Sequence, residues 1–192
     1  MTEILVLYYS RHGSTARLAQ AIAAGIESAG CSARIRTVAP IREYQSSEVT
    51  AVPDNGPPFV SKQDLKECAG LALGSPTRFG NMAAPLKHFI DSTSDIWLKG
   101  ELIDKPFCVF TSTSSLHGGQ ESTLLTMAIP LLHQGMIYCG LPYSEPALHD
   151  TRTGGTPYGV THVQNNQGLS SHEQQLAAAM GKRLAQIATK LR

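Results

Sequence analysis

The start of the chain combines an apolar run with a hydroxyl-rich turn and the beginning of a helical pattern. The apolar run covers residues 4–9, and Ser10-Arg11-His12-Gly13-Ser14-Thr15 follows it directly. A turn that opens into a helix directs unpaired backbone N–H groups and the positive end of the helix dipole at one place, where a phosphate can bind. Three hydroxyl side chains add donors, and the glycine permits a sharp bend. This corner predicts a phosphate site; an ordinary turn in which Ser or Thr caps the helix is the alternative.

Two common phosphate loops are excluded at this corner. No Gly-Lys-Ser/Thr follows, as a nucleoside-triphosphate loop requires. The turn carries one glycine, whereas the dinucleotide fingerprint needs three.

Apolar strands and amphipathic helices alternate along the chain. This order predicts a doubly wound parallel sheet with helices on both faces. In such sheets ligands bind beyond the carboxyl ends of the strands, so the loops at 10–15, 75–81 and 112–119 are expected to converge. Residues 40–62 are predicted to form a long irregular loop, and residues 141–170 show no clear period. Strands are predicted at 4–9, 32–38, 70–75, 107–111 and 136–139, and helices at 15–29, 64–67, 81–93, 122–134 and from 171 onward.

Length and composition favour a globular cytoplasmic protein. The chain has 192 residues and is expected to form one domain, residues 1–192. Its formal net charge of +1 argues against a nucleic-acid partner, which would require a clustered basic face. No stretch predicts a membrane span or a signal peptide. The four cysteines form no C-x-x-C pair, so we expect them to be reduced and buried, with no metal site.

Further motifs lie downstream of the first corner. They are Pro-Thr-Arg-Phe-Gly-Asn-Met at 76–82, the Ser- and Gly-rich stretch 112–121, His133, and Gly-Gly-Thr-Pro-Tyr-Gly at 154–159. Together with Tyr8-Tyr9 and the first corner, they resemble the WrbA family of flavodoxin-like, FMN-dependent NAD(P)H:quinone oxidoreductases. The resemblance covers nearly the whole chain, and the string at 76–82 is its most specific part. It implies a flavodoxin-like α/β fold whose five-stranded parallel sheet has the order 2-1-3-4-5.

The resemblance also implies site residues. The first corner would hold the FMN phosphate, and residues 77–79 and 112–119 would surround the ring and ribityl chain. The implied cofactor-binding set is Ser10, Arg11, His12, Gly13, Ser14, Thr15, Pro76, Thr77, Arg78, Phe79, Gly80, Asn81, Ser112, Thr113, Ser114, Ser115, Leu116, His117, Gly118, Gly119 and His133. The implied substrate-binding set is His12, Phe79, Trp97, His133 and Tyr143, in which Trp97 forms a lid that a second subunit can supply.

Two parts of the sequence depart from the family pattern. Residues 114–117, Ser-Ser-Leu-His, stand where mostly small residues are expected, so the atoms that would touch flavin in this loop are left open. His12 stands where the family often has a phenol side chain, and it is either a shaper of nicotinamide entry or an ordinary surface histidine.

The activity implied by the resemblance is two-electron reduction of quinones by NADH or NADPH. Donor and quinone would use one site over the flavin in turn, in a ping-pong sequence, and the family's homotetramer, a dimer of dimers, is expected. The flavin supplies the redox chemistry, so no separate catalytic side chain is expected. A one-electron carrier flavodoxin, an FMN or azo-dye reductase and a regulatory role are the alternatives. A carrier is disfavoured because such proteins are strongly acidic, whereas this chain is balanced in charge.

Overall fold

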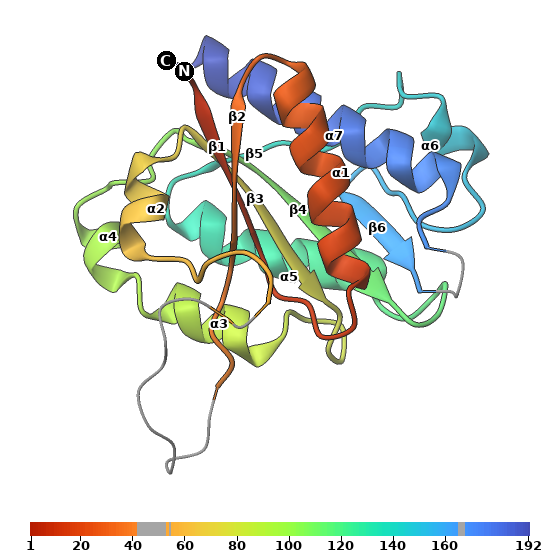
Figure 1. Ribbon diagram of the computed structural model, residues 1–192, viewed down its shortest axis with the longest axis horizontal. Helices are drawn as coiled ribbons and strands as arrows, with labels where there is room; N and C mark the ends of the chain where they lie inside the picture. The colour runs from red at the N-terminus through yellow and green to blue at the C-terminus, as the bar shows by residue number, and fades with distance from the viewer. Residues whose placement is uncertain (42–52, 54, 165–167) are drawn as a thin grey trace.

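A parallel sheet forms the centre of the protein, and helices cover both of its faces (Figure 1). The computed structural model describes residues 1–41, 53, 55–164 and 168–192, so most of the predicted loop at 40–62 lies outside the described part. The predicted strand order is confirmed: the strands follow one another as β2-β1-β3-β4-β5. These strands are β1 (Glu3–Tyr8), β2 (Ser32–Thr37), β3 (Gly70–Pro76), β4 (Pro106–Thr113) and β5 (Ile137–Tyr138).

A sixth strand completes the sheet beside β4. Strand β6 (Val160–Val163) pairs with Phe110–Thr113 in the second half of β4, whereas β5 pairs only with Pro106 and Phe107 at its start. The edge next to β4 is therefore filled by two short strands from different parts of the chain. Strand β6 was not predicted, because four residues inside a segment without periodicity give too short a pattern to read.

Seven helices are described, and most agree with the predicted segments. The predicted helix at 81–93 is shorter in the structure, because α3 begins at Ala84 with Pro85 in its first turn, the position that proline favours. The predicted loop at 112–119 also differs, since β4 continues through Thr113. The helices are α1 (Ser14–Ser28), α2 (Lys62–Glu67), α3 (Ala84–Asp91), α4 (Ser94–Leu98), α5 (Gln120–His133), α6 (Ala147–Asp150) and α7 (Ser171–Lys190).

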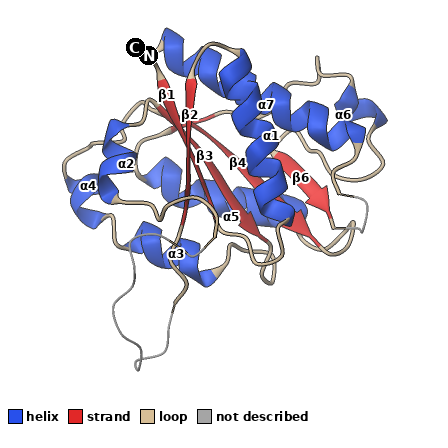
Figure 2. Ribbon diagram, in the orientation of Figure 1, coloured by secondary structure: helices blue, strands red, loops and turns tan. Residues whose placement is uncertain are grey.

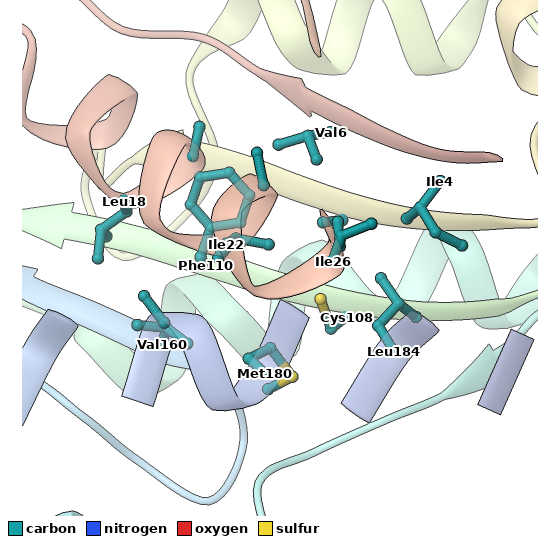
Figure 3. Close-up of a cluster of buried hydrophobic side chains, with 14 of the residues drawn as sticks. Ile4, Val6, Leu18, Ile22, Ile26, Cys108, Phe110, Val160, Met180 and Leu184 are labelled. Carbon is teal, nitrogen blue, oxygen red and sulfur yellow. The ribbon is translucent and has the colours of Figure 1, made fainter. Parts of the chain in front are cut away.

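Each face of the sheet has its own apolar core, because alternate residues of a strand point to opposite faces. On one face, Phe110 and Val160 pack with α1 and α7, and Figure 3 shows this cluster. On the other face, Phe107 and Val109 pack against α2, α3, α4 and α5. Figure 2 shows the resulting layers of helix, sheet and helix.

Helices α1 and α7 approach each other closely through two glycines. A Cβ at Gly25 would overlap the carbonyl oxygen of Ala178, and a Cβ at Gly181 would overlap that of Ile22. This contact fixes α1, whose first turn belongs to the predicted phosphate site.

The prediction of buried, reduced cysteines is confirmed, since Cys31, Cys68, Cys108 and Cys139 are all buried and unpaired. Within the described ranges, no helix is both long enough and apolar enough to cross a membrane.

Candidate functional site

A hollow opens where β1, β3 and β4 end. The three loops expected to converge do so here. The hollow is lined by Ser10, Arg11, His12, Ser14, Thr15, Pro76, Thr77, Arg78, Ser112, Thr113, Ser114 and Gln164. The structure thus brings together the first corner, the start of the 76–82 string and the end of β4.

The first turn of α1 forms one wall of the hollow. Gly13 precedes the helix with a left-handed φ of +85°, and no side chain caps the helix N-terminus. The alternative of an ordinary Ser or Thr cap is therefore wrong. Ser10 Oγ instead accepts a hydrogen bond from the Gly13 N–H at 3.1 Å, within the turn itself. Because no side chain caps the first turn, its backbone N–H groups are free to bind an anion such as a phosphate.

A hydroxyl pair joins the first turn of α1 to β4. Thr15 Oγ1 and Ser112 Oγ lie 2.9 Å apart, and both residues are buried. Within the described residues, no carboxylate forms a hydrogen bond with either hydroxyl. The floor of the hollow is therefore polar and uncharged, while Arg11 and Arg78 stand at its walls.

The string at 76–82 forms a tight turn. The backbones of Arg78 and Asn81 exchange two hydrogen bonds, of 2.7 and 3.1 Å. Between them Phe79 has a φ of +52° and its side chain is fully exposed. A bulky residue rarely adopts this backbone conformation, and such strain is concentrated at ligand sites. The turn thus holds an aromatic ring out into solvent beside the hollow.

The loop after β4 contributes only its beginning to the hollow. Ser114, Ser115, Leu116 and His117 are exposed, and of these four only Ser114 lines the hollow. The rest of the loop is folded on itself, since Gln120 Nε2 donates to Leu116 O at 2.6 Å. Gly119 then meets Gly80 of the neighbouring turn, where a Cβ would lie 3.1 Å from the Gly80 Cα.

Gln164 lines the hollow although it was not predicted to do so. It directly follows β6, and its N–H donates to Thr113 O at 2.7 Å. A single glutamine in a segment without periodicity carries no local signal. Its place at the site depends on the unpredicted pairing of β6 with β4.

A buried histidine–carboxylate pair stands behind the hollow. His162 of β6 is the register partner of Ser112, and its Nδ1 lies 2.9 Å from Glu173 Oε2. Both side chains are fully buried. The Glu173 carboxylate also accepts N–H bonds from Gly154, Val163 and Ser170. Burial alone would raise the pKa of Glu173, but the hydrogen bonds from His162 and from the backbone N–H groups of Ser170 and Val163 lower it to about 2.

The ionised carboxylate fixes the histidine and the surrounding chain. Because Glu173 can only accept hydrogen bonds when ionised, His162 carries a proton on Nδ1. The carboxylate thereby ties the glycine-rich segment, β6 and the start of α7 together behind Ser112. The sequence carried a sign of this only at Ser170 and Glu173, whose spacing is that of a capping box.

Three predicted substrate residues lie elsewhere in the subunit. His133 is the last residue of α5. Two residues later, the carbonyl oxygen of Gly135 accepts a hydrogen bond from Asp104 N, which lies just before the start of β4. Because α5 has 14 residues and begins near the hollow, His133 at its far end lies about 20 Å from the end of the sheet where the hollow opens. Trp97 is its neighbour, with ring centroids 5.6 Å apart. Tyr143 instead lies against His149, at 5.3 Å.

The comparisons with known proteins place the chain in a family. Among solved structures, the WrbA-like flavodoxin from Agrobacterium tumefaciens matches with a TM-score of 0.69 and 21% identity, over 100% of both chains. That likeness confirms the flavodoxin-like fold. A family model described as NADPH-dependent FMN reductase matches residues 2–144.

Two relatives match over their full lengths, and both carry the name NAD(P)H dehydrogenase (quinone). The one from Gluconacetobacter diazotrophicus is 41% identical over 100% of this chain and 99% of its own. The one from Geotalea uraniireducens is 40% identical over 98% of each chain. The chain therefore belongs to the NADPH-dependent FMN reductase family, among relatives named as quinone dehydrogenases, and the family resemblance predicted from the motifs is confirmed.

Proposed function

We propose that residues 1–192 form one FMN-binding domain that reduces quinones with NADH or NADPH. Membership of the family makes the chain a flavin-dependent oxidoreductase. The observation that carries the choice of FMN is the uncapped first turn of α1 in the hollow, which suits a single terminal phosphate. FMN has one such phosphate.

The residues of the hollow fit the phosphate by their donor chemistry. The backbone N–H groups of the first turn, with the hydroxyls of Ser10, Ser14 and Thr15, would hold the phosphate oxygens. Bound flavin supplies hydride acceptance and donation. Thr77 and Arg78 would line its ring and present backbone groups to its polar edge, while Ser112 to Ser114 would contact the ribityl chain.

Phe79 and His12 border the open side of this site. The fully exposed ring of Phe79 provides an apolar surface against which a flat nicotinamide or quinone can pack. His12 is exposed at the rim of the hollow, where it can shape entry. We infer that donor and quinone occupy this same place in turn, which predicts ping-pong kinetics.

Trp97, His133 and Tyr143 would then act in the site of a neighbouring subunit. Within one chain, Trp97 and His133 form an exposed aromatic pair far from the hollow. Leu125, Ile129 and Leu132 are exposed on the same helix as His133, which gives α5 an outward apolar face. We propose that this face packs in a homotetramer, a dimer of dimers. Sedimentation as a single 20.6 kDa chain would contradict it.

Mixing two inactive variants tests whether one site uses two subunits. Ser14→Glu disables the phosphate site, and Trp97→Ala with His133→Ala removes the aromatic pair. Each variant alone is expected to lose most activity, whereas mixed oligomers recover a share of it, because some sites combine the intact parts of both. Quinone-dependent NADH oxidation after subunit exchange measures this.

Mixing Ser14→Glu with Thr15→Asp is the control, because both variants damage the same part and no combination can restore it. Failure of the first mixture to recover, in oligomers shown to have exchanged subunits, would place the aromatic pair outside the site.

Activity with several acceptors tests the proposed reaction. The FMN-loaded protein is expected to oxidise NADH or NADPH when benzoquinone is supplied, with parallel double-reciprocal lines. The family name makes free FMN a second candidate acceptor, so FMN and an azo dye belong in the same assay. No turnover with any acceptor would favour a carrier flavodoxin, and converging lines would refute the ping-pong sequence. The four free, buried cysteines support our placement of the protein in the cytoplasm.

A further inference from the structure

A second hollow adjoins the first and shares Arg11 and Arg78 with it. Its floor is apolar and includes Met82, Ala83 and Pro85 at the start of α3. Phe79 also lines it. The proposed phosphate site of FMN uses the first hollow and leaves this floor without a function.

Three cationic side chains surround this floor, and each comes from a different part of the chain. Arg11 follows β1, Arg78 follows β3 and Lys87 lies on α3. In the described part of the chain, Lys87 is the only one of the three that forms an ion pair, and its Nζ lies 2.6 Å from Asp91 Oδ1. Both of these side chains are about half exposed, so the pair holds Lys87 only weakly. The hollow therefore carries an excess of positive charge in a chain whose formal net charge is only +1.

This combination of an apolar floor and several cations fits a phosphorylated nucleotide. A flat base packs on apolar and aromatic side chains, while guanidinium and ammonium groups bind phosphate oxygens through charge-assisted hydrogen bonds. Arg11 and Arg78, at the border of both hollows, can serve phosphates near the flavin. Lys87 borders only the second hollow, and its exposed pair with Asp91 holds it weakly enough for it to bind a phosphate farther from the flavin.

We propose that the second hollow binds the adenosine end of NADPH and that Lys87 contacts its 2′-phosphate, the group that NADH lacks. This rests on the proposed function, because it assumes that the nicotinamide end lies over the flavin. Lys87 then sets the preference between the two dinucleotides without touching the reacting atoms.

Nucleotide fragments test this assignment without turnover. The protein with excess FMN is titrated calorimetrically with 2′,5′-ADP and with 5′-AMP, which differ in the 2′-phosphate. Wild-type protein is expected to bind 2′,5′-ADP about tenfold more tightly, since a hydrogen bond to a charged group contributes about this factor. Lys87→Gln is expected to remove most of this preference and to leave FMN affinity unchanged.

Two further variants separate recognition from a general charge effect. Lys182→Gln removes a charge from an exposed position on α7 and should keep the full preference. Asp91→Asn releases Lys87 from its carboxylate and should keep or increase the preference, whereas a structural role of the pair would make it behave like Lys87→Gln.

Equal affinity of wild-type protein for the two fragments, or an unchanged preference in Lys87→Gln, would overturn the assignment. These results are independent of the reaction itself. A protein that binds 2′,5′-ADP selectively but reduces no quinone would contradict the proposed function and retain this subsite, and the ratio of KM values for NADPH and NADH gives the corresponding kinetic readout.

Discussion

Ser14→Glu is expected to weaken FMN binding by about 10²- to 10³-fold while leaving the free energy of unfolding nearly unchanged. Ser14 is the first residue of α1, is buried, and lines the proposed phosphate site. A carboxylate there repels a phosphate dianion and occupies its donors. Arg17, whose Nη2 donates to Ser14 Oγ at 3.3 Å, would pair with the new carboxylate and help to hold it in place. A negative charge at a helix N-terminus is itself favourable, so the fold is retained.

Two variants serve as controls for this prediction. Gln20→Glu adds the same charge to the exposed face of α1, outside the hollow, and should leave FMN affinity within about twofold. Ser14→Ala removes one hydroxyl and should cost about tenfold or less. Quenching of FMN fluorescence gives the affinities, and urea unfolding gives the stability. If Ser14→Glu binds FMN as well as Gln20→Glu does, the first turn of α1 is not the phosphate site.

The first corner could be predicted because the residues that indicate it lie close together in the sequence. An apolar strand, a glycine turn and a helical stripe follow one another within residues 4–29, and the parallel order of the elements predicts that the later loops meet this corner. The structure confirms that meeting, since Ser112 bonds to Thr15 across 97 positions of sequence. The missing side-chain cap was less predictable, because it depends on which residue the helix begins at: Gly13 stands at the cap position and has no side chain to accept an N–H bond.

The far wall of the site could not be predicted in the same way. Gln164 reaches the hollow through β6, a four-residue strand in a segment without periodicity, and the edge of the sheet accepts β6 because β5 ends after two residues. Such pairing depends on tertiary contacts. The separation of His133 from the hollow was also not predicted, since the resemblance implied a possible second-subunit origin for Trp97 and not for His133.

Glu173→Gln is expected to destabilise the protein by about 3 kcal/mol at neutral pH, because it replaces a buried carboxylate acceptor and leaves buried hydrogen-bond donors unsatisfied. The carboxylate binds His162 and three backbone N–H groups, and an amide cannot accept all of these bonds. Amide exchange at Gly154, Val163 and Ser170 should therefore accelerate. Exposed Glu27 provides the control: Glu27→Gln should change stability by less than about 0.5 kcal/mol.

The stabilisation that Glu173 provides is also expected to depend on pH, and the shift of its pKa defines the direction. Folding lowers the pKa of Glu173 from 4.5 to about 2, so the folded state binds fewer protons than the unfolded state between these values. The stabilisation is present above pH 4.5 and is lost as the pH falls toward 2. The stability gap between wild type and Glu173→Gln should therefore narrow on acidification, in denaturant titrations at successive pH values. A gap that stays constant from neutral pH to pH 2 would mean that the ionised carboxylate does not hold β6 and α7 together behind the site.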